Sequence, residues 1–151
     1  MRTAHLEPKH ESRARRPSAR LRLEAVAWVG VFRLMLWVLP FRSSLALARR
    51  AAGRAPDEGS HVTPAEVEGA LAGVGRFVPS ASCLPRALAA GVLLSRREAA
   101  VDLLLGTPVG QARAKFAAHA WVEVDGVPSY GATETSHHPV ARLPLRPSAD
   151  A

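Results

Sequence analysis

Two segments decide the fold of this chain, Ser82-Cys83-Leu84-Pro85-Arg86-Ala87-Leu88 and Ala118-His119-Ala120-Trp121-Val122-Glu123-Val124. The first places the only cysteine at the start of an apolar helical pattern, and the second places a histidine in an alternating strand pattern. A nucleophile and its base are commonly mounted in this way. Taken alone, however, a single cysteine is most often a small buried hydrophobic residue, and a strand histidine is most often a satisfied polar one.

The helix predicted to begin at Cys83 has an apolar face wide enough to be the central buried helix of the fold. Ser80 and Ser82 offer caps, and Pro85 fits because the first turn has no use for its missing N–H. A helix start and a nearby imidazole both favour the thiolate form of a cysteine. We therefore expect the sulfur of Cys83 to lie within proton-transfer reach of His119.

Strand patterns follow this helix. Residues 99–105 form a buried apolar run closed by Gly106, and residues 116–124 carry the clearest alternation. Asp125-Gly126 is a typical hairpin turn into residues 127–130. A last edge segment is expected beyond residue 136. Together with the helices, these strands predict an α+β fold.

Composition shifts divide the chain into segments. We expect one domain plus tails, because 151 residues with 48% hydrophobic content suffice for one core. Thr63-Pro64-Ala65-Glu66 has the pattern of a capped helix start after a linker rich in Pro, Asp, Gly and Ser. The predicted segments are a disordered basic tail (1–20), an apolar helical segment (21–53), the main domain (62–145) and a loose C-terminus (146–151).

The formal charge of +7 belongs mostly to the tail. Residues 1–22 contain seven Lys or Arg and two Glu, a net charge of +5, so the rest of the chain carries about +2. No basic face interleaved with aromatic residues supports binding to nucleic acid. One cysteine excludes an internal disulfide and a multi-cysteine zinc site, and no signal peptide is visible, so a cytoplasmic location is expected.

The apolar run from Leu21 to Leu39 predicts a helix that packs in the core or lies at an interface. Its uninterrupted apolar length is short for a bilayer span, and Arg33 lies in its middle. Arginines on both sides keep a second role open, in docking to a membrane surface or to a partner.

The two central segments resemble the transglutaminase-like leader peptidases of lasso-peptide (microcin-type) biosynthesis. The resemblance covers residues 21–145 and includes the helix that ends Leu39-Pro40-Phe41-Arg42. It implies a papain/transglutaminase-like fold, in which N-terminal helices and a Cys-bearing helix pack on a small antiparallel sheet. It also implies that Cys83 is the nucleophile and His119 the general base and acid.

By the same resemblance, the substrate is a ribosomally made precursor peptide whose leader is removed. The partners implied are a separate leader-binding protein and an ATP-dependent lasso cyclase that closes the released core. The chain looks like the stand-alone protease form of the family. The reaction needs neither a metal nor another cofactor.

The third catalytic position departs from the family pattern. The family places an Asp about a dozen residues after the His, where this chain has Gly131. Asp125 lies about 20 Å along the strand from His119 by strand rise, too far to reach it. Across the predicted hairpin, Glu134 is the nearest carboxylate and the preferred orienter of the imidazole, with a backbone carbonyl or a water as alternatives.

Two further residues are candidates for contacts with substrate. Trp121 lies two residues from His119 and so on the same strand face, where it would wall the cleft, although strand aromatics are more often core. Arg86 would meet the leader or lie on the exposed side of its helix. His137-His138 indicates a metal site only weakly, since no third ligand accompanies the pair.

Two other functions remain open at this point. One is acyl transfer in place of hydrolysis, as in transglutaminases. The other is a non-catalytic scaffold that presents the precursor to the cyclase.

Overall fold

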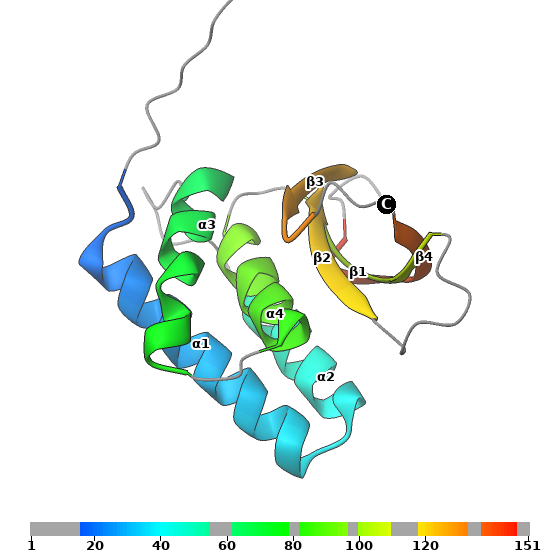
Figure 1. The fold of residues 1–151 in the computed structure, drawn as a ribbon, viewed down its shortest axis with the longest axis horizontal. Helices are drawn as coiled ribbons and strands as arrows, with labels where there is room; N and C mark the ends of the chain where they lie inside the picture. The colour runs from blue at the N-terminus through cyan, green and yellow to red at the C-terminus, as the bar shows by residue number, and fades with distance from the viewer. Residues whose placement is uncertain are drawn as a thin grey trace, which may run out of the picture.

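The computed structural model describes residues 16–54, 62–78, 82–96, 100–109, 118–132 and 137–147. These residues form an α+β fold in which helices lie on one side of an antiparallel sheet, as predicted (Figure 1). The helices are α1 (Ala19–Val38), α2 (Phe41–Ala52), α3 (Pro64–Ala72), the short 3-10 helix η1 (Val74–Arg76) and α4 (Cys83–Leu94). The strands are β1 (Val101–Pro108), β2 (His119–Val124), β3 (Val127–Tyr130) and β4 (His137–Arg146).

Local capping explains where the N-terminal helices begin. The hydroxyl of Ser18 accepts a hydrogen bond from the N–H of Leu21, so α1 starts at Ala19, inside the segment predicted to be a disordered tail. Residues 1–15 of that predicted tail lie outside the described residues. In α3, Thr63 and Glu66 form the capping box expected from the sequence.

The sheet has the strand order β3-β2-β1-β4, with every neighbouring pair antiparallel. The turn between β2 and β3 has positive φ at Asp125 and Gly126, the backbone conformation that the two-residue hairpin requires. β1 continues through Gly106 to Pro108, so the prediction that Gly106 closes this strand is wrong. Pairing of Gly106 with both neighbouring strands explains the extension.

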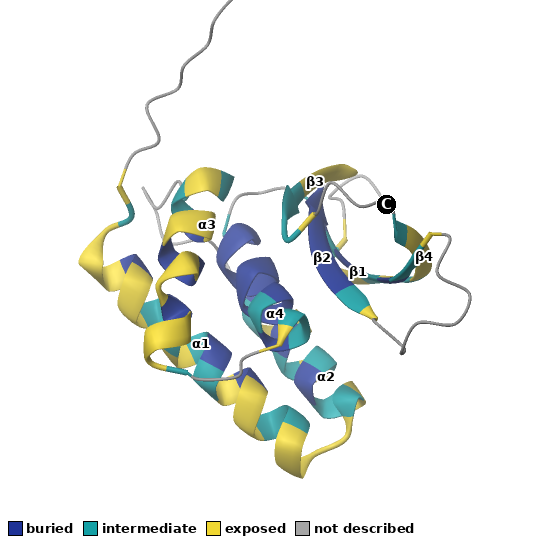
Figure 2. Ribbon diagram, in the orientation of Figure 1, coloured by how far each residue is buried: buried dark blue, intermediate teal, exposed yellow. Residues whose placement is uncertain are grey.

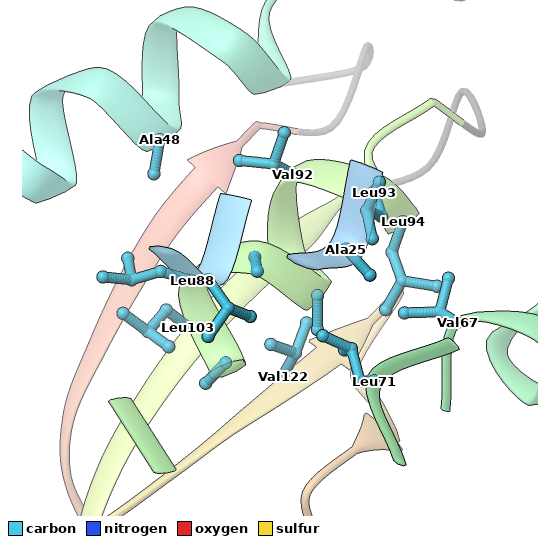
Figure 3. Packing of buried hydrophobic residues seen from close by; sticks show 14 of the residues in the cluster. Ala25, Ala48, Val67, Leu71, Leu88, Val92, Leu93, Leu94, Leu103 and Val122 are labelled. Carbon is cyan, nitrogen blue, oxygen red and sulfur yellow. The ribbon is translucent and has the colours of Figure 1, made fainter. Parts of the chain in front are cut away.

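Helix α4 occupies the centre of the molecule. It contacts the three other α-helices as well as β1 and β2, and every residue from Ala87 to Leu94 is buried. Figure 3 shows Leu88 of this helix beside Leu103 of β1 and near Val122 of β2. A helix that is apolar all round belongs in a core, and this one is enclosed by the other layers.

The N-terminal helices share this core. α1 contributes Leu21, Ala25, Val29 and Phe32, and α2 contributes Ala48 and Ala52. None of the helices in the described part of the chain is long and apolar enough to cross a membrane.

The face of the sheet that points away from α4 carries a charged cluster. Arg142 of β4 donates to Asp102 of β1 and to Glu123 of β2, each at 2.7 Å. Asp102, which interrupts the apolar pattern of its strand, therefore has a partner on the neighbouring strand. Because Arg142 is exposed, this pairing contributes little to stability but helps to fix the strand register.

Candidate active site

Cys83 is the first residue of α4 and is partly buried. Its Sγ lies 3.7 Å from the carbonyl oxygen of Ala118, to which the thiol donates. The thiol therefore lies against the start of β2, next to the residue that precedes His119. Ser82 is the N-cap of α4, but its side chain makes no capping bond, so its predicted role as a hydroxyl cap is wrong.

His119 is held by the main chain. Its Nε2 lies 2.5 Å from the carbonyl oxygen of Gly131. A carbonyl oxygen only accepts, so Nε2 carries the proton and the neutral ring keeps its lone pair on Nδ1. An imidazole in this tautomer presents a basic nitrogen on the side opposite its orienting partner.

Gly131 stands where the family pattern has its aspartate, and the structure shows how a residue without a side chain contacts the ring from there. Its φ is +73°, and a Cβ added to it would lie 3.3 Å from the carbonyl oxygen of Ala120. A side chain at this position would be strained in backbone and crowded in space. The backbone carbonyl of Gly131 is the hydrogen-bond acceptor beside Nε2. Glu134, the predicted orienter, lies outside the described residues.

The thiol and the imidazole are not hydrogen-bonded to each other in this structure. Ala120 faces α4 in the core, so strand alternation directs His119 to the other face of the sheet. The sulfur of Cys83 lies on the helix side of the start of β2. The ring of His119 lies on the opposite side of that strand. The two groups are adjacent along the chain at Ala118 without the direct contact that the sequence led us to expect.

An aromatic stack packs around the imidazole. The ring of His119 lies 6.2 Å from that of Trp121, at 17°, and 4.8 Å from that of His137, at 32°. Trp121 is buried, and its Nε1 donates to Glu123 at 3.3 Å. The stack bridges β2 and β4 across the middle strand β1. Sequence reasoning placed Trp121 beside His119 and missed the part played by His137.

Gly106 makes this bridge possible. A Cβ at Gly106 would lie 2.8 Å from the ring of Trp121 and 2.5 Å from the carbonyl oxygen of His138. Because Gly106 has no side chain, the indole of Trp121 can lie across β1 toward β4. The glycine was read from the sequence as a strand terminator, whereas its role is close packing.

Arg86 and Tyr130 form a second group near Cys83. Arg86 follows Cys83 by three residues, so the two side chains leave α4 on one face. Its Nε is buried and has no hydrogen-bond partner among the described residues. Burial raises the pKa of the Tyr130 hydroxyl, the positive charge of Arg86 opposes that rise, and Glu68 and Cys83 add to it. The charge of Arg86 therefore acts on Tyr130, which lies on the strand that pairs with β2.

No group of three metal-binding side chains occurs among the residues that the structure places. His137 and His138 are neighbours on β4, so their side chains point to opposite faces of the sheet.

The fold therefore places a thiol at the head of a buried helix, beside a sheet that carries an oriented imidazole. A sequence profile of the transglutaminase-like superfamily matches residues 26–142, more than half of the chain. The chain belongs to the transglutaminase-like superfamily. No curated protein and no solved structure matches it.

Replacing Gly106 with alanine is expected to lower the free energy of unfolding by about 1–3 kcal/mol, because either the indole or strand β4 must move. The near-ultraviolet circular dichroism of Trp121 should change with it. Urea unfolding measures the change in the free energy of unfolding, and the near-ultraviolet circular dichroism of the folded protein reports the change around Trp121.

Gly30→Ala is the matched control. A Cβ there meets nothing within 4 Å, and the position lies inside α1, so stability should rise by about 0.5–1 kcal/mol. Equal effects of the two substitutions would contradict the close packing at Gly106.

The raised pKa of Tyr130 predicts a stability that depends on pH. Above pH of about 10 the unfolded chain releases a phenolic proton that the folded chain keeps, so the free energy of unfolding should fall as pH rises. Tyr130→Phe should remove this part of the fall. Because the chain has one tyrosine, its tyrosinate absorbance reports Tyr130 alone. If the tyrosinate absorbance rises at the same pH in the folded and in the urea-unfolded protein, the pKa of Tyr130 is not raised by folding, and the predicted pH dependence is excluded.

Proposed function

We propose that this protein is a cysteine peptidase that removes the leader from a ribosomally made lasso-peptide precursor. The superfamily membership and the two motifs around Cys83 and His119 support this proposal. The observation that carries it is the contact of Cys83 Sγ with the residue preceding His119, while that ring keeps Nδ1 free of partners among the described residues.

The proposed reaction has two steps. His119 takes the proton of the Cys83 thiol through an intervening water at the start of β2, because the two side chains lie on opposite sides of the strand there, and the thiolate forms a C–S bond with the scissile carbonyl carbon. As the C–N bond breaks, the imidazolium gives its proton to the departing amine of the core. Water, deprotonated by the same imidazole, then attacks the thioester. This releases the leader as a carboxylate and returns the proton to the sulfur.

In this proposal the carbonyl of Gly131 orients His119 in place of a carboxylate. A carbonyl dipole stabilises an imidazolium less than a full negative charge does. Cys–His pairs operate without a carboxylate, so the substitution is compatible with turnover at a reduced rate.

Trp121 and Arg86 are the proposed substrate contacts. Trp121 stacks beside His119 and would shield the ring from water. The buried Nε of Arg86 has no acceptor within the part of the chain that the structure describes, and a buried donor without a partner is unfavourable. A backbone carbonyl or carboxylate of the bound peptide would supply that acceptor, one helical turn from the sulfur.

The proposed partners are the precursor peptide, a separate leader-binding protein and an ATP-dependent lasso cyclase, in the cytoplasm. In this scheme the amine released by the peptidase is the group that the cyclase joins to a side-chain carboxylate of the core.

One observation favours a second candidate function. Because the thiol and the imidazole are not hydrogen-bonded, a scaffold that binds the precursor without cleaving it is the alternative. Acyl transfer to an amine would use the same thioester, and a labelled amine recovered in the product would identify it.

The test is cleavage of the precursor by the purified chain together with its leader-binding protein. Mass spectrometry should detect leader and core fragments. Cys83→Ala should reduce the rate by more than about 10³-fold, because no other thiol exists in the chain, while precursor binding persists.

Ser82→Ala is the matched control, because its hydroxyl makes no capping bond and the residue is exposed. It should cleave at the unmodified rate. Intact precursor with the unmodified protein would favour the scaffold, and persistent cleavage by Cys83→Ala would exclude the proposed nucleophile.

Arg86 has its own test. Arg86→Gln is expected to raise KM for the precursor by about tenfold, because it removes a charge-assisted hydrogen bond, with thermal stability preserved. Arg76→Gln, on the exposed η1, serves as the control for charge alone. An unchanged KM, or an equal rise in both variants, would remove Arg86 from the substrate site.

A further inference from the structure

Helix α1 has two apolar faces. The row that packs in the core is Leu21, Ala25, Val29 and Phe32. A second row with the same spacing is Leu23, Ala27, Val31, Leu34 and Val38, which are all exposed. The two rows are about 160° apart around the helix axis. The outer row, with Trp37 beside it, is called here the outer stripe.

The outer stripe is unusually exposed for apolar side chains. Trp37 is 84% exposed and Leu23 is 72% exposed. Among the described residues, ten large hydrophobic side chains are exposed, and six of them belong to α1 and its C-cap: Leu23, Val31, Leu34, Trp37, Val38 and Leu39. Figure 2 shows exposed segments, in yellow, along the side of α1 that is turned away from α4. A contiguous patch of this kind marks an interaction surface, unlike isolated exposed residues.

Shallow hollows adjoin the stripe. One, of about 560 Å³, lies between α1 and α3 and is lined by Leu23, Val26 and Phe77 with Arg22 and Arg76 beside them. Another, of about 430 Å³, is lined by Gly30, Arg33, Leu34 and Trp37. An apolar group that enters either hollow would lie next to the guanidinium group of an arginine.

The charges on α1 itself are mostly positive. Between Ala19 and Val38 the helix carries Arg20, Arg22 and Arg33 against a single acidic residue, Glu24, a net charge of +2. Glu24 is paired with Arg20 and Arg96. Arg22 and Arg33 are eleven residues apart and so lie along one border of the stripe, where both are exposed. The occupant of this surface must be apolar in its body and anionic at its boundary.

We propose that the outer stripe binds the surface of an anionic lipid bilayer, with α1 lying parallel to it. Apolar side chains would enter the acyl boundary, Arg22 and Arg33 would extend to the phosphates, and Trp37 would lie at headgroup level. The stripe has no hydroxyl, amide or carboxyl group with which to fix a protein partner by hydrogen bonds, as protein interfaces do. A second copy of the chain would bring two arginine borders together.

This inference is independent of the proposed peptidase activity. It is tested with the full chain and vesicles of phosphatidylcholine, alone or mixed with phosphatidylglycerol. Co-sedimentation should be at least about tenfold stronger with the anionic vesicles and should weaken as salt is added.

Leu34→Gln should weaken vesicle binding by about tenfold, because it removes one buried apolar side chain from the bound state. Val140→Gln is the matched control: Val140 is 72% exposed on β4, away from the stripe, and its loss should leave binding unchanged. Both side chains are exposed, so thermal unfolding should be unaffected in both variants.

Tryptophan fluorescence supplies a second readout. Trp121 is buried and Trp28 partly buried, so a blue shift and protection from acrylamide on anionic vesicles should come from Trp37. The Trp37→Phe variant should still co-sediment with anionic vesicles, but its fluorescence should show no blue shift.

Equal binding to neutral and anionic vesicles would overturn the proposal. So would equal losses in the Leu34 and Val140 variants. Binding to an acidic amphipathic peptide without binding to anionic vesicles would assign the stripe to a protein partner instead.

Discussion

The burial of α4 on every side is the constraint on which the other features depend. Helices α1, α2 and α3 enclose it from one direction and strands β1 and β2 from the other, and its residues from Ala87 to Leu94 are all buried. Since the body of this helix cannot shift without opening the core, its first turn is fixed against the start of β2. The position of Cys83 is therefore a consequence of packing many residues away from it.

The imidazole is positioned by different forces. Its Nε2 is tied to a main-chain oxygen, and its faces are packed by Trp121 and His137. Strand β1 lies between β2 and β4, and it contributes by leaving room at Gly106 for the ring of Trp121. The site thus combines a nucleophile fixed by a hydrophobic core with a base fixed by a hydrogen bond and ring stacking. These two systems meet at Ala118.

Local patterns in the sequence were sufficient for most of the fold. The apolar periodicity before Pro40, the box at Thr63 and the turn at Asp125-Gly126 each act within a few residues, and the structure has the elements they predict. The extent of β1 was missed because Gly106 is a strand breaker by propensity and is retained here by contacts with β2 and β4.

The relation between the two central side chains could not be predicted in the same way. It depends on which face of β2 each residue occupies and on where β3 returns, which are properties of tertiary packing. The bulge between β2 and β3 shifts the returning strand, so a main-chain atom of Gly131 meets the ring. The sequence is compatible with a backbone carbonyl as the acceptor, but no side-chain pattern singles out the carbonyl of Gly131.

An acceptor of this kind is hidden from alanine scanning. Every residue of the chain presents the same carbonyl group, so exchanging side chains one at a time at positions other than Gly131 would leave the ring's support chemically intact and report no third member of the site. Only a change that displaces the main chain near residue 131, or an amide-to-ester replacement that weakens that carbonyl as an acceptor, would expose its contribution.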